Sequence, residues 1–585
     1  MYKKKFIFFI FIEIIYSIPI HTVGKRELES NKNNDIVILH TNDVHCGVMD
    51  SIGYDGLMLY KKQLLQKYQN VILVDAGDHL QGGAIGLISN GEAIIDIMNK
   101  LEYDVVTLGN HEFDYGVSQL ENCAKMLKCG YISCNYCLSK DKKSIYPGYK
   151  IIEKGNKKIA FIGISHPHTL SKSNLIKIKD ENGKQFYDFL TENHNQKLFN
   201  RIQEQINEVK KEGADYVILL AHLGIGGDVS EENTSSGILK NLENVDAILD
   251  GHTHLVYSKT APDKNGKNIP IVQTGSKLNY IGLLIIHSDG TITHENINNV
   301  FYDSNIKSDS LKIKRGNKEV WVDKEMYDYI NEIENSFSEI LNKVIGITYF
   351  DLNINNIGQK LSRKDENSFC NLIADAFRYY GEADISIINS GSVRSDIKEG
   401  DITYKDIINA IPFSNDIYIK EITGQTILDA LEFGVKSLPK LSPRFPQVSG
   451  ITFNIDTSIK SSVIVDDDEM FVGVGGERRV YNVTINGKEL DINKKYTISS
   501  SSFILGGGDG YSMFIPYEIK KTSFGIDNEI VLKYITEILN GIIPDKYKDA
   551  EGRIIKTQGK IINQNGSLFK KFYNKFIRLL QYVYK

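Results

Sequence analysis

Six short apolar runs lie between residues 35 and 287, and each is followed by a polar cluster and then by a stretch with a helical pattern. Each run has the length of a strand, and most are rich in β-branched residues. Strands that alternate with helices predict a layered α/β domain, whose functional groups gather just beyond the carboxyl ends of the strands. The runs are Ile36–Leu39, Val71–Val74, Val105–Leu108, Ile159–Ile164, Tyr216–Leu220 and Ala247–Leu249.

A second domain is expected because the chain has 585 residues, and a single hydrophobic core stops growing at roughly 250–300 residues. A charged helical stretch over residues 322–343 is predicted to connect the two domains, which we place at 34–321 and 344–562. The second half mixes helical segments with strand-like runs, which indicates another α/β domain. The formal net charge of -5 lacks the basic footprint typical of proteins that bind long nucleic acid, so we expect no such partner.

Both ends of the chain carry basic and apolar residues in patterns associated with membranes. At the start, Lys3–Lys5 precede an apolar run, Phe6–Ile20, which is typical of a signal peptide over residues 1–25. Glu13 interrupts that run, and an uncleaved anchor is the alternative, although a spanning helix needs roughly 20 apolar residues. We therefore expect a secreted protein, extracellular or periplasmic. At the other end, residues 563–585 have the pattern of a basic amphipathic helix that contacts a membrane surface weakly or docks on its own protein.

Four of the six cysteines crowd into a short segment. In an exported protein such a cluster predicts a structural disulfide, although the spacing does not define the pairing. Cys134 and Cys137 also have the CxxC spacing of zinc and redox sites, but a zinc site needs further ligands and none lie close in sequence. We therefore expect a disulfide within the set Cys123, Cys129, Cys134 and Cys137.

The polar clusters after five of the apolar runs share Asp, Asn or His side chains, which bind divalent metals of borderline hardness. Imidazole suits zinc, iron or manganese, and carboxylate oxygen suits manganese or magnesium. Two metals about 3.5–4 Å apart need a shared ligand, and Asp78, alone on its strand end, is the natural bridge. One such cluster occurs easily by chance, but five at successive strand ends predict a two-metal site. The clusters are His40–His45, Asp75–Asp78, Gly109–Asp114, Ala221–His222 and Asp250–His254.

The order of these clusters, Asp-x-His, Gly-Asp, Gly-Asn-His-Glu, a lone His and Gly-His-x-His, resembles the calcineurin-like metallophosphoesterase superfamily. The fuller strings at 40–45 (HTNDVH) and 109–116 (GNHEFDYG) resemble its 5′-nucleotidase branch, which includes bacterial periplasmic UDP-sugar hydrolases and animal ecto-5′-nucleotidases. The resemblance extends over nearly the whole chain, from residue 35 to about 560. It implies a four-layer α/β/β/α sandwich that holds the metals and a separate domain that binds base and ribose.

Carried over position by position, the resemblance implies two metal sites and a catalytic pair. His111 would donate to the phosphoryl oxygen or the leaving group, and Asp114 would fix its tautomer and keep it cationic. His40, His79 and the segment His166–His168 match no ligand of the family, and we interpret the last as a loop after a strand. Asp43, His45 and His254 would hold the first metal, Asn110, His222 and His252 the second, and Asp78 would bridge them.

Three clusters in the second half suit a nucleotide better than a bare phosphate, namely Asn389–Arg394, Ile411–Asn415 and Phe503–Tyr511. An arginine can clamp phosphate oxygens, and two phenylalanines can enclose a base, since every base offers a π-face. Taken alone, either phenylalanine would more often belong to a core, but the resemblance implies that both stack on the base and that an aspartate binds the ribose. Lys364 stands where the family often has a second arginine. The implied substrate contacts are Arg363, Asn389, Arg394, Phe413, Asn415, Phe503 and Asp509.

The resemblance implies a phosphoesterase that uses two divalent ions, zinc, manganese or similar. It would hydrolyse nucleoside 5′-monophosphates to nucleoside and phosphate by in-line attack of a metal-bound hydroxide. One alternative is a broader hydrolase of UDP-sugars, ADP, ATP or cyclic nucleotides. Another is a catalytically silent exported protein that binds nucleotides. That second alternative predicts loss of a ligand or of His111, and the sequence retains all of them.

Overall fold

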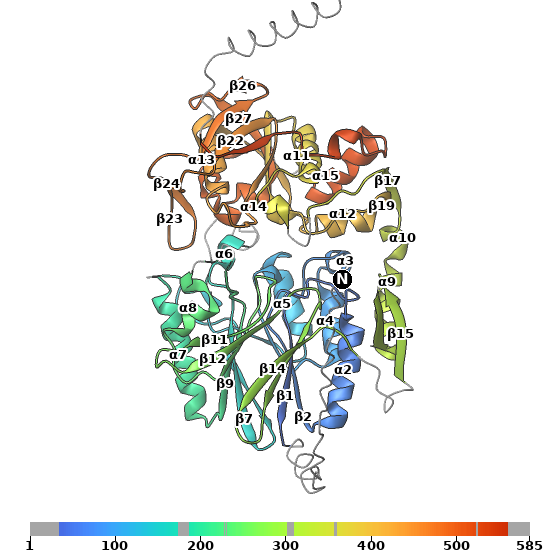
Figure 1. Cartoon of the computed structure of the whole chain (residues 1–585), viewed down its shortest axis with the longest axis vertical. Coiled ribbons are helices and arrows are strands. Elements are labelled where there is room, and N and C mark those ends of the chain that lie inside the picture. Colours follow the sequence, from blue (N-terminus) through green and yellow to red (C-terminus); the bar gives the residue numbers. More distant parts are fainter. Residues whose placement is uncertain are drawn as a thin grey trace, which may run out of the picture.

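Two lobes stacked along the long axis of the molecule make up the fold (Figure 1). The first lobe contains two six-stranded sheets, and the second contains a five-stranded and a four-stranded sheet. The two-domain α/β fold expected from the sequence is confirmed. The computed structural model describes residues 34–559, apart from 173–185, 193, 227–228, 230, 301–308, 317, 356–359 and 522–524.

The two sheets of the first lobe have the strand orders β14-β13-β1-β2-β3-β4 and β11-β12-β10-β9-β7-β6. Within them β1 to β4 run parallel to one another, as do β7, β9, β10 and β12. The first sheet comprises β1 (Ile36–Thr41), β2 (Asn70–Asp75), β3 (Val105–Thr107), β4 (Tyr131–Ile132), β13 (Ile281–Ile286) and β14 (Ile292–Ile297). The second comprises β6 (Tyr149–Lys154), β7 (Lys157–Ile164), β9 (Tyr216–Ala221), β10 (Ala247–Leu249), β11 (Val256–Pro262) and β12 (Asn268–Thr274).

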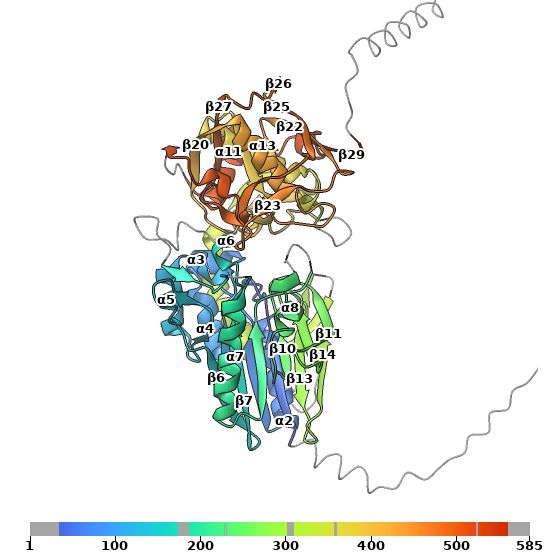
Figure 2. The same ribbon diagram turned by 90° about the vertical axis from the view of Figure 1, so that its left-hand side faces the viewer.

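The sheets pack face to face, with helices on their outer surfaces (Figure 2). Because side chains alternate along a strand, β1 turns Val37 and Leu39 toward the helices and Ile38 toward the other sheet. Phe161 and Leu220 meet Ile38 from the second sheet in the central core. The expected α/β/β/α sandwich is therefore present. Its outer helices are α2 (Gly53–Lys67), α4 (Glu92–Leu101), α5 (Val117–Met126), α7 (Gln196–Lys211) and α8 (Ser235–Leu239).

A hairpin and two helices connect the lobes. The hairpin of β15 (Ser310–Arg315) and β16 (Lys318–Asp323) packs on α2, and α9 (Lys324–Ser336) and α10 (Ser338–Leu341) follow it. Asp323 begins α9, because its Oδ1 accepts a hydrogen bond from the Met326 backbone at 2.9 Å. The stretch predicted to be a helical connector, residues 322–343, contains the end of β16 and both helices.

The second lobe surrounds its larger sheet, ordered β21-β18-β27-β20-β28, with helices, and its smaller sheet is ordered β26-β25-β22-β29. The strands are β18 (Ile385–Asn389), β20 (Ile417–Thr423), β21 (Pro446–Ser449), β22 (Ile451–Asp456), β25 (Val480–Ile485), β26 (Lys488–Glu489), β27 (Lys495–Ser501), β28 (Ile519–Lys521) and β29 (Ile554–Thr557). The main helices are α11 (Ser368–Gly381), α12 (Tyr404–Ala410), α13 (Gly424–Gly434) and α15 (Asp527–Lys533), and β17 (Val344–Thr348) pairs with β19 (Gly400–Thr403).

The lobes contact each other at two places. At one of them the Gln81 amide donates to the Pro412 carbonyl at 3.2 Å, and the Ala84 backbone donates to Asn409 at 3.1 Å. Elsewhere the Thr191 hydroxyl donates to Asp468, at the tip of the hairpin β23 (Val463–Val465) and β24 (Phe471–Val474), at 2.7 Å. The lobes are therefore held together across the region between them.

The predicted disulfide is wrong, because all six cysteines are free thiols. Cys123, on α5, packs in the core between the first sheet and its helices, whereas Cys134 and Cys137 pack in the core beneath α7. The Cys137 sulfur faces the Cys134 carbonyl oxygen at 3.9 Å rather than the Cys134 sulfur. These cysteines therefore act as small buried apolar side chains.

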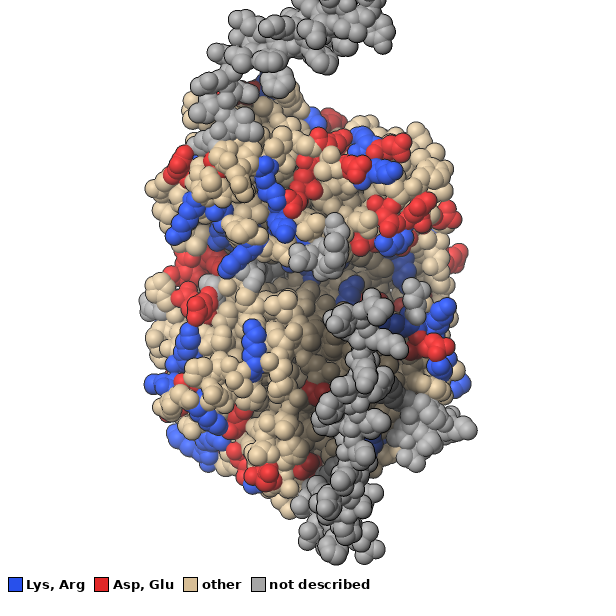
Figure 3. Space-filling model, in the orientation of Figure 1, with Lys and Arg blue, Asp and Glu red and all other residues tan. Residues whose placement is uncertain are grey.

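The predicted signal peptide and the predicted amphipathic tail both lie outside the described residues. Within the part of the chain that the structure describes, no helix is long and apolar enough to cross a membrane. On the face shown in Figure 3, acidic and basic side chains are interspersed over both lobes.

Candidate metal centre and substrate cavity

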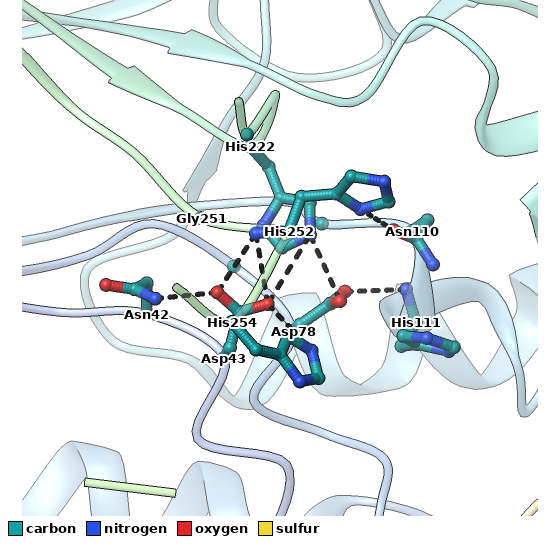
Figure 4. A network of polar contacts seen from close by, with 12 residues as sticks. Asn42, Asp43, Asp78, Asn110, His111, His222, Gly251, His252 and His254 are labelled. Carbon is teal, nitrogen blue, oxygen red and sulfur yellow. Dashed lines mark hydrogen bonds and ion pairs between the residues drawn. The ribbon is translucent and has the colours of Figure 1, made fainter. Parts of the chain in front are cut away.

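Side chains from five strand ends of the first lobe point toward one centre (Figure 4). The strands β1, β2, β3, β9 and β10 supply them, so residues from both sheets meet at the edge that faces the second lobe. Asp43, Asp78 and His222 are almost completely buried. The complete set is the seven residues predicted as ligands, Asp43, His45, Asp78, Asn110, His222, His252 and His254, and the structure brings all of them together.

The donor atoms form two groups that share Asp78. The first contains Asp43, His45 and His254, and the second contains His222 and His252. In the first group the Nε2 atoms of His45 and His254 are 3.0 Å apart, and His254 Nε2 is 3.4 Å from Asp43 Oδ1. In the second, His222 Nε2 is 3.0 Å from Asp78 Oδ2. Ligands about 2.1 Å from one tetrahedral ion lie roughly 3.4 Å apart, so both groups fit a divalent cation.

The electrostatics of the cluster also favour bound cations. Burial raises the pKa of Asp43 to about 8, and the Asp78 carboxylate adds to that rise. Burial also opposes ionisation of Asp78, but His222 and His111 outweigh it and hold its pKa well below the usual range. Burial keeps the pKa values of His45 and His254 well below the ordinary value, which leaves neutral imidazoles able to ligate. Burial lowers the pKa of His222, but the carboxylates of Asp78 and Asp43 outweigh it and raise that pKa to about 10. The negative charge of these two buried carboxylates is what a pair of cations would neutralise.

Five of the seven residues adopt left-handed backbone conformations. Asp43, His45, Asp78, His252 and His254 have φ values of 51°, 48°, 61°, 83° and 56°. Such conformations are uncommon for residues other than glycine and concentrate at functional sites. Gly77 has a φ of 92° and packs so closely on Gly109 that an added Cβ would lie 2.3 Å from the Gly109 nitrogen. The strand ends therefore turn sharply and aim their side chains inward.

Two buried carboxylates outside the ligand set fasten these turns. Glu112 accepts backbone hydrogen bonds from Asp78, His79 and Gly109 at 2.6–2.9 Å, and a longer one from Leu80 at 3.2 Å. It thereby ties the turn after β2 to the turn after β3. On the second sheet, Asp250 accepts from the backbones of Leu223, Gly224 and Gly251 at 2.9–3.0 Å, which ties the turn after β9 to that after β10.

Glu112→Gln is expected to lower the free energy of unfolding by about 1–3 kcal/mol. Both carboxylate oxygens of Glu112 accept hydrogen bonds from buried backbone N–H groups. Glutamine has the same shape, but its NH₂ group cannot accept such a hydrogen bond. Urea denaturation of the variant measures the loss. The matched control is Glu121→Gln on the exposed face of α5, which should leave stability unchanged. Equal stability of both variants would show that the carboxylate does not fasten the turns.

His111 and Asp114 form the pair that the resemblance implied. His111 Nδ1 lies 2.6 Å from Asp114 Oδ2, and the His111 backbone donates to Asp78 Oδ1 at 2.8 Å. Burial lowers the pKa of His111, but the carboxylates of Asp114 and Asp78 outweigh it, so the pKa rises above its usual value. The ring lies 5.2 Å from the His45 ring and 5.7 Å from the Phe413 ring. The His111 imidazole, whose raised pKa favours the cationic form, therefore lies next to both the Asp/His cluster and the second lobe.

One cavity of about 720 Å³ joins this centre to the second lobe. Its walls include Asp78, Asn110, His111, His252 and His254 from the first lobe. The opposite walls contain all seven predicted substrate contacts, Arg363, Asn389, Arg394, Phe413, Asn415, Phe503 and Asp509.

The polar groups of the second lobe are held in place by neighbours. Asn389 Nδ2 donates to Asp509 Oδ2 at 2.7 Å, and Asp509 sits in a left-handed turn with a φ of 54°. The Arg394 guanidinium lies 5.6 Å from the centre of the Phe413 ring. Asn415 Nδ2 donates to Asp527 at 3.2 Å. These contacts orient an aromatic face, a carboxylate and a guanidinium into the same cavity.

Sequence reasoning missed two lysines in this cavity, Lys360 and Lys440. They line it together with Lys364 and the two arginines. Desolvation pushes the pKa of Lys360 well below its usual range, and the positive charges of Arg363 and Arg394 lower it further. Clusters of basic residues around Arg363 were the available signal. The cavity is suited to an anionic ligand.

The histidines set aside in the sequence have different environments. His79 is structural, with Nδ1 2.9 Å from Asp75 and Nε2 2.9 Å from the Tyr131 hydroxyl. His40 is buried between the sheets, and burial lowers its pKa to about 3. His166 lies in the turn after β7, as expected, but its ring packs against that of His252 with 4.0 Å between centroids. That contact with the metal cluster was not predicted.

Comparison with known proteins places both lobes in characterised families. Residues 36–256 match the calcineurin-like phosphoesterase model, and residues 344–515 match the model of the 5′-nucleotidase C-terminal domain. The chain is 27% identical over 580 residues to a snake venom 5′-nucleotidase of Crotalus adamanteus, covering 90% of each chain. It is 25% identical over 569 residues to the trifunctional nucleotide phosphoesterase YfkN of Bacillus subtilis, covering 89% of this chain but only 35% of that longer protein.

A solved structure supports the fold. The 5′-nucleotidase precursor from Thermus thermophilus superimposes with a TM-score of 0.70 at 21% identity, covering 90% of this chain and 100% of that one. The two matched models follow one another in the order of the two lobes, and the Asp/His cluster lies in the first of them. The chain therefore belongs to the 5′-nucleotidase family, with a calcineurin-like phosphoesterase domain, and is a metal-dependent phosphoester hydrolase.

Proposed function

We propose that the protein hydrolyses nucleoside 5′-monophosphates to a nucleoside and phosphate, using two divalent ions. The observation that carries the proposal is the shared cavity. The Asp/His cluster lines one end, while Phe413, Phe503 and Asp509 line the other lobe. A general phosphatase needs the first end alone, whereas a nucleotidase needs a second end that accepts a base and a ribose.

The residues that line the cavity and the Asp/His cluster divide the chemistry among them. Asp43, His45 and His254 would hold one cation, Asn110, His222 and His252 the other, and Asp78 both. Bound there, the cations would lower the pKa of water and neutralise phosphate oxygens, and zinc or manganese suits this mixture of imidazole and carboxylate. His111, kept cationic by Asp114, would donate a proton or hydrogen bond to the phosphoryl or leaving oxygen. Arg363 and Arg394 would orient the phosphate.

The two phenylalanines proposed to stack on the base, Phe413 and Phe503, provide the test of this proposal. Phe413→Ala or Phe503→Ala should lower kcat/KM for AMP by about 5- to 150-fold, because one stacking contact is worth about 1–3 kcal/mol. Hydrolysis of p-nitrophenyl phosphate should barely change, since that substrate has no base and the metal cluster is untouched. The ratio of the two efficiencies is measured in wild type and in both variants. An unchanged ratio would show that the second lobe does not bind the base.

A broader nucleotide hydrolase is the second candidate, and the cation-lined cavity favours it. Lys364 and Lys440 supplement two arginines, which is more positive charge than one monophosphate requires. This candidate predicts that ADP, ATP or UDP-glucose is hydrolysed as efficiently as AMP. Measuring kcat/KM for these substrates and for 2′,3′-cyclic AMP separates it from the first candidate.

We further propose that the protein is exported. The basic and apolar pattern of residues 1–25 supports this, as does the similarity to a venom enzyme. The domain limits that we propose are 34–321 and 344–562, with residues 322–343 between them.

A further inference from the structure

His166 lies at the edge of the sheet where the proposed ligands gather. It is the second residue after β7, and β7 runs parallel to β9, with Ile164 opposite Ala221. The His222 backbone donates to the Ile164 carbonyl at 2.8 Å, so the ends of the two strands are joined next to the cluster. The His166 side chain is only 1% exposed. A sixth strand end therefore delivers a buried imidazole beside the metal centre.

A tight turn holds the His166 ring in one orientation. The His168 backbone donates to His166 Nδ1 at 3.1 Å, and the His166 carbonyl accepts from the Thr169 backbone at 3.0 Å and from its hydroxyl at 2.6 Å. The neighbouring His168 ring is held at its Nε2 by Asn233, at 2.5 Å. Because Nδ1 accepts a hydrogen bond, the neutral ring carries its proton on Nε2. The hydrogen bond at Nδ1 therefore restrains the orientation of the His166 ring.

The face of the His166 ring packs on the ring of His252. Their centroids are 4.0 Å apart, and the planes are inclined by 36°. On another side, the His222 ring meets His252 edge-on with centroids 5.3 Å apart. His252 Nδ1 lies 2.9 Å from Asn110 Oδ1. The His252 ring therefore contacts two other rings, and its Nδ1 faces Asn110.

His252 needs such contacts because its backbone is unusual. Its φ is 83°, and its backbone nitrogen donates to both oxygens of Asp43, at 3.1 and 3.0 Å. These contacts fix the backbone but leave rotation of the ring to be set by its surroundings. Within the described residues, His166 is not a member of either donor group, so it acts on the cluster through His252 rather than as a ligand.

We propose that His166 is a positioning residue, whose ring face fixes the plane of His252 and thereby raises the affinity of the second cation site. The inference rests on the proposed metal centre. Groups that orient a metal ligand typically contribute about 10–100-fold to metal affinity. The contact that carries this role is between the two rings, whose centroids are 4.0 Å apart.

The test compares His166→Phe with His166→Leu in the full chain. Phenylalanine keeps a flat ring face, and leucine has comparable bulk without one. After removal of metal, each variant is titrated with Co²⁺ against a competing chelator, and the visible absorption of bound Co²⁺ is recorded. We expect His166→Leu to weaken one of two Co²⁺ equivalents by about 10–100-fold and to alter the absorption band, whereas His166→Phe stays close to wild type. The other equivalent should be bound normally in both.

His168→Ala is the matched control, since it removes another buried ring of the same turn, which lies 5.7 Å from the His166 ring and is held at its Nε2 by Asn233. It should change Co²⁺ affinity far less than His166→Leu. The inference is overturned if His166→Leu binds both equivalents with wild-type affinity and spectrum, or if His166→Phe is weakened as much as His166→Leu. Failure of the proposed function looks different: wild type would then bind no Co²⁺, or would bind it and not hydrolyse AMP.

Discussion

Asp78→Ala is expected to abolish turnover and to remove both cations. Asp78 belongs to both donor groups, and its Oδ2 lies 3.0 Å from His222 and 3.8 Å from His45. Without the cations, the pKa of the attacking water returns from about 7 toward about 15.7, so kcat should fall by several orders of magnitude. Elemental analysis of the purified variant and its rate with AMP check both parts.

The comparison variant is His254→Ala, which removes a member of one donor group only and should mainly weaken one site. Exhaustive chelation of the wild type should reproduce the loss seen in Asp78→Ala, and added Mn²⁺ or Zn²⁺ should reverse it. Full activity after chelation, or a metal content unchanged by the loss of Asp78, would contradict the two-cation centre.

His111→Ala is expected to lower kcat by about 10²–10⁴-fold, the usual contribution of a general acid or base. The His111 ring lies next to the cluster, and its pKa is raised by Asp114 and Asp78 despite burial, so the wild type presents a cation to the developing charge. Metal content should stay near that of the wild type, because His111 belongs to neither donor group.

Steady-state rates and metal analysis of the same preparation separate the two effects. Asp114→Asn serves as the companion variant, because it retains a side chain beside His111 but withdraws the negative charge. It should lower kcat less than His111→Ala and in the same direction. A wild-type kcat for His111→Ala would contradict the proposed role of His111 as a proton or hydrogen-bond donor. Loss of metal in that variant would show instead that His111 contributes to metal binding.

The metal ligands at the strand ends could be predicted because the apolar run of each strand and the polar residues that follow it are both local features of the sequence. An apolar run and the polar residues after it are adjacent in sequence, so Asp43 and His45 after β1, or His252 and His254 after β10, could be placed without knowledge of the fold. The family resemblance then supplied the roles. The second lobe was harder, because Phe413 and Phe503 are far apart in sequence, and neither carries a local sign that it lines a cavity.

What could not be predicted depends on contacts between distant elements. Glu112 stands in a recognisable string, but its four acceptor contacts join two strand ends, and no spacing in the sequence specifies them. His166 was set aside because it matches no family ligand, yet a parallel pairing of β7 with β9 brings it onto His252. The cysteine prediction failed for a related reason: residues close in sequence, such as Cys123 and Cys134, pack in separate cores.

The left-handed turns at the strand ends limit how this site could be transplanted. A designer who placed the same seven side chains on regular strands of another sheet would aim them in the wrong directions, because five of them have φ values between 48° and 83°. These turns also depend on Glu112 and Asp250, whose carboxylates accept hydrogen bonds from backbone N–H groups and are not proposed to bind metal. The smallest portable unit is therefore the five turns with both carboxylates and the adjoining strand pairs, and a graft of the ligands alone should bind metal poorly.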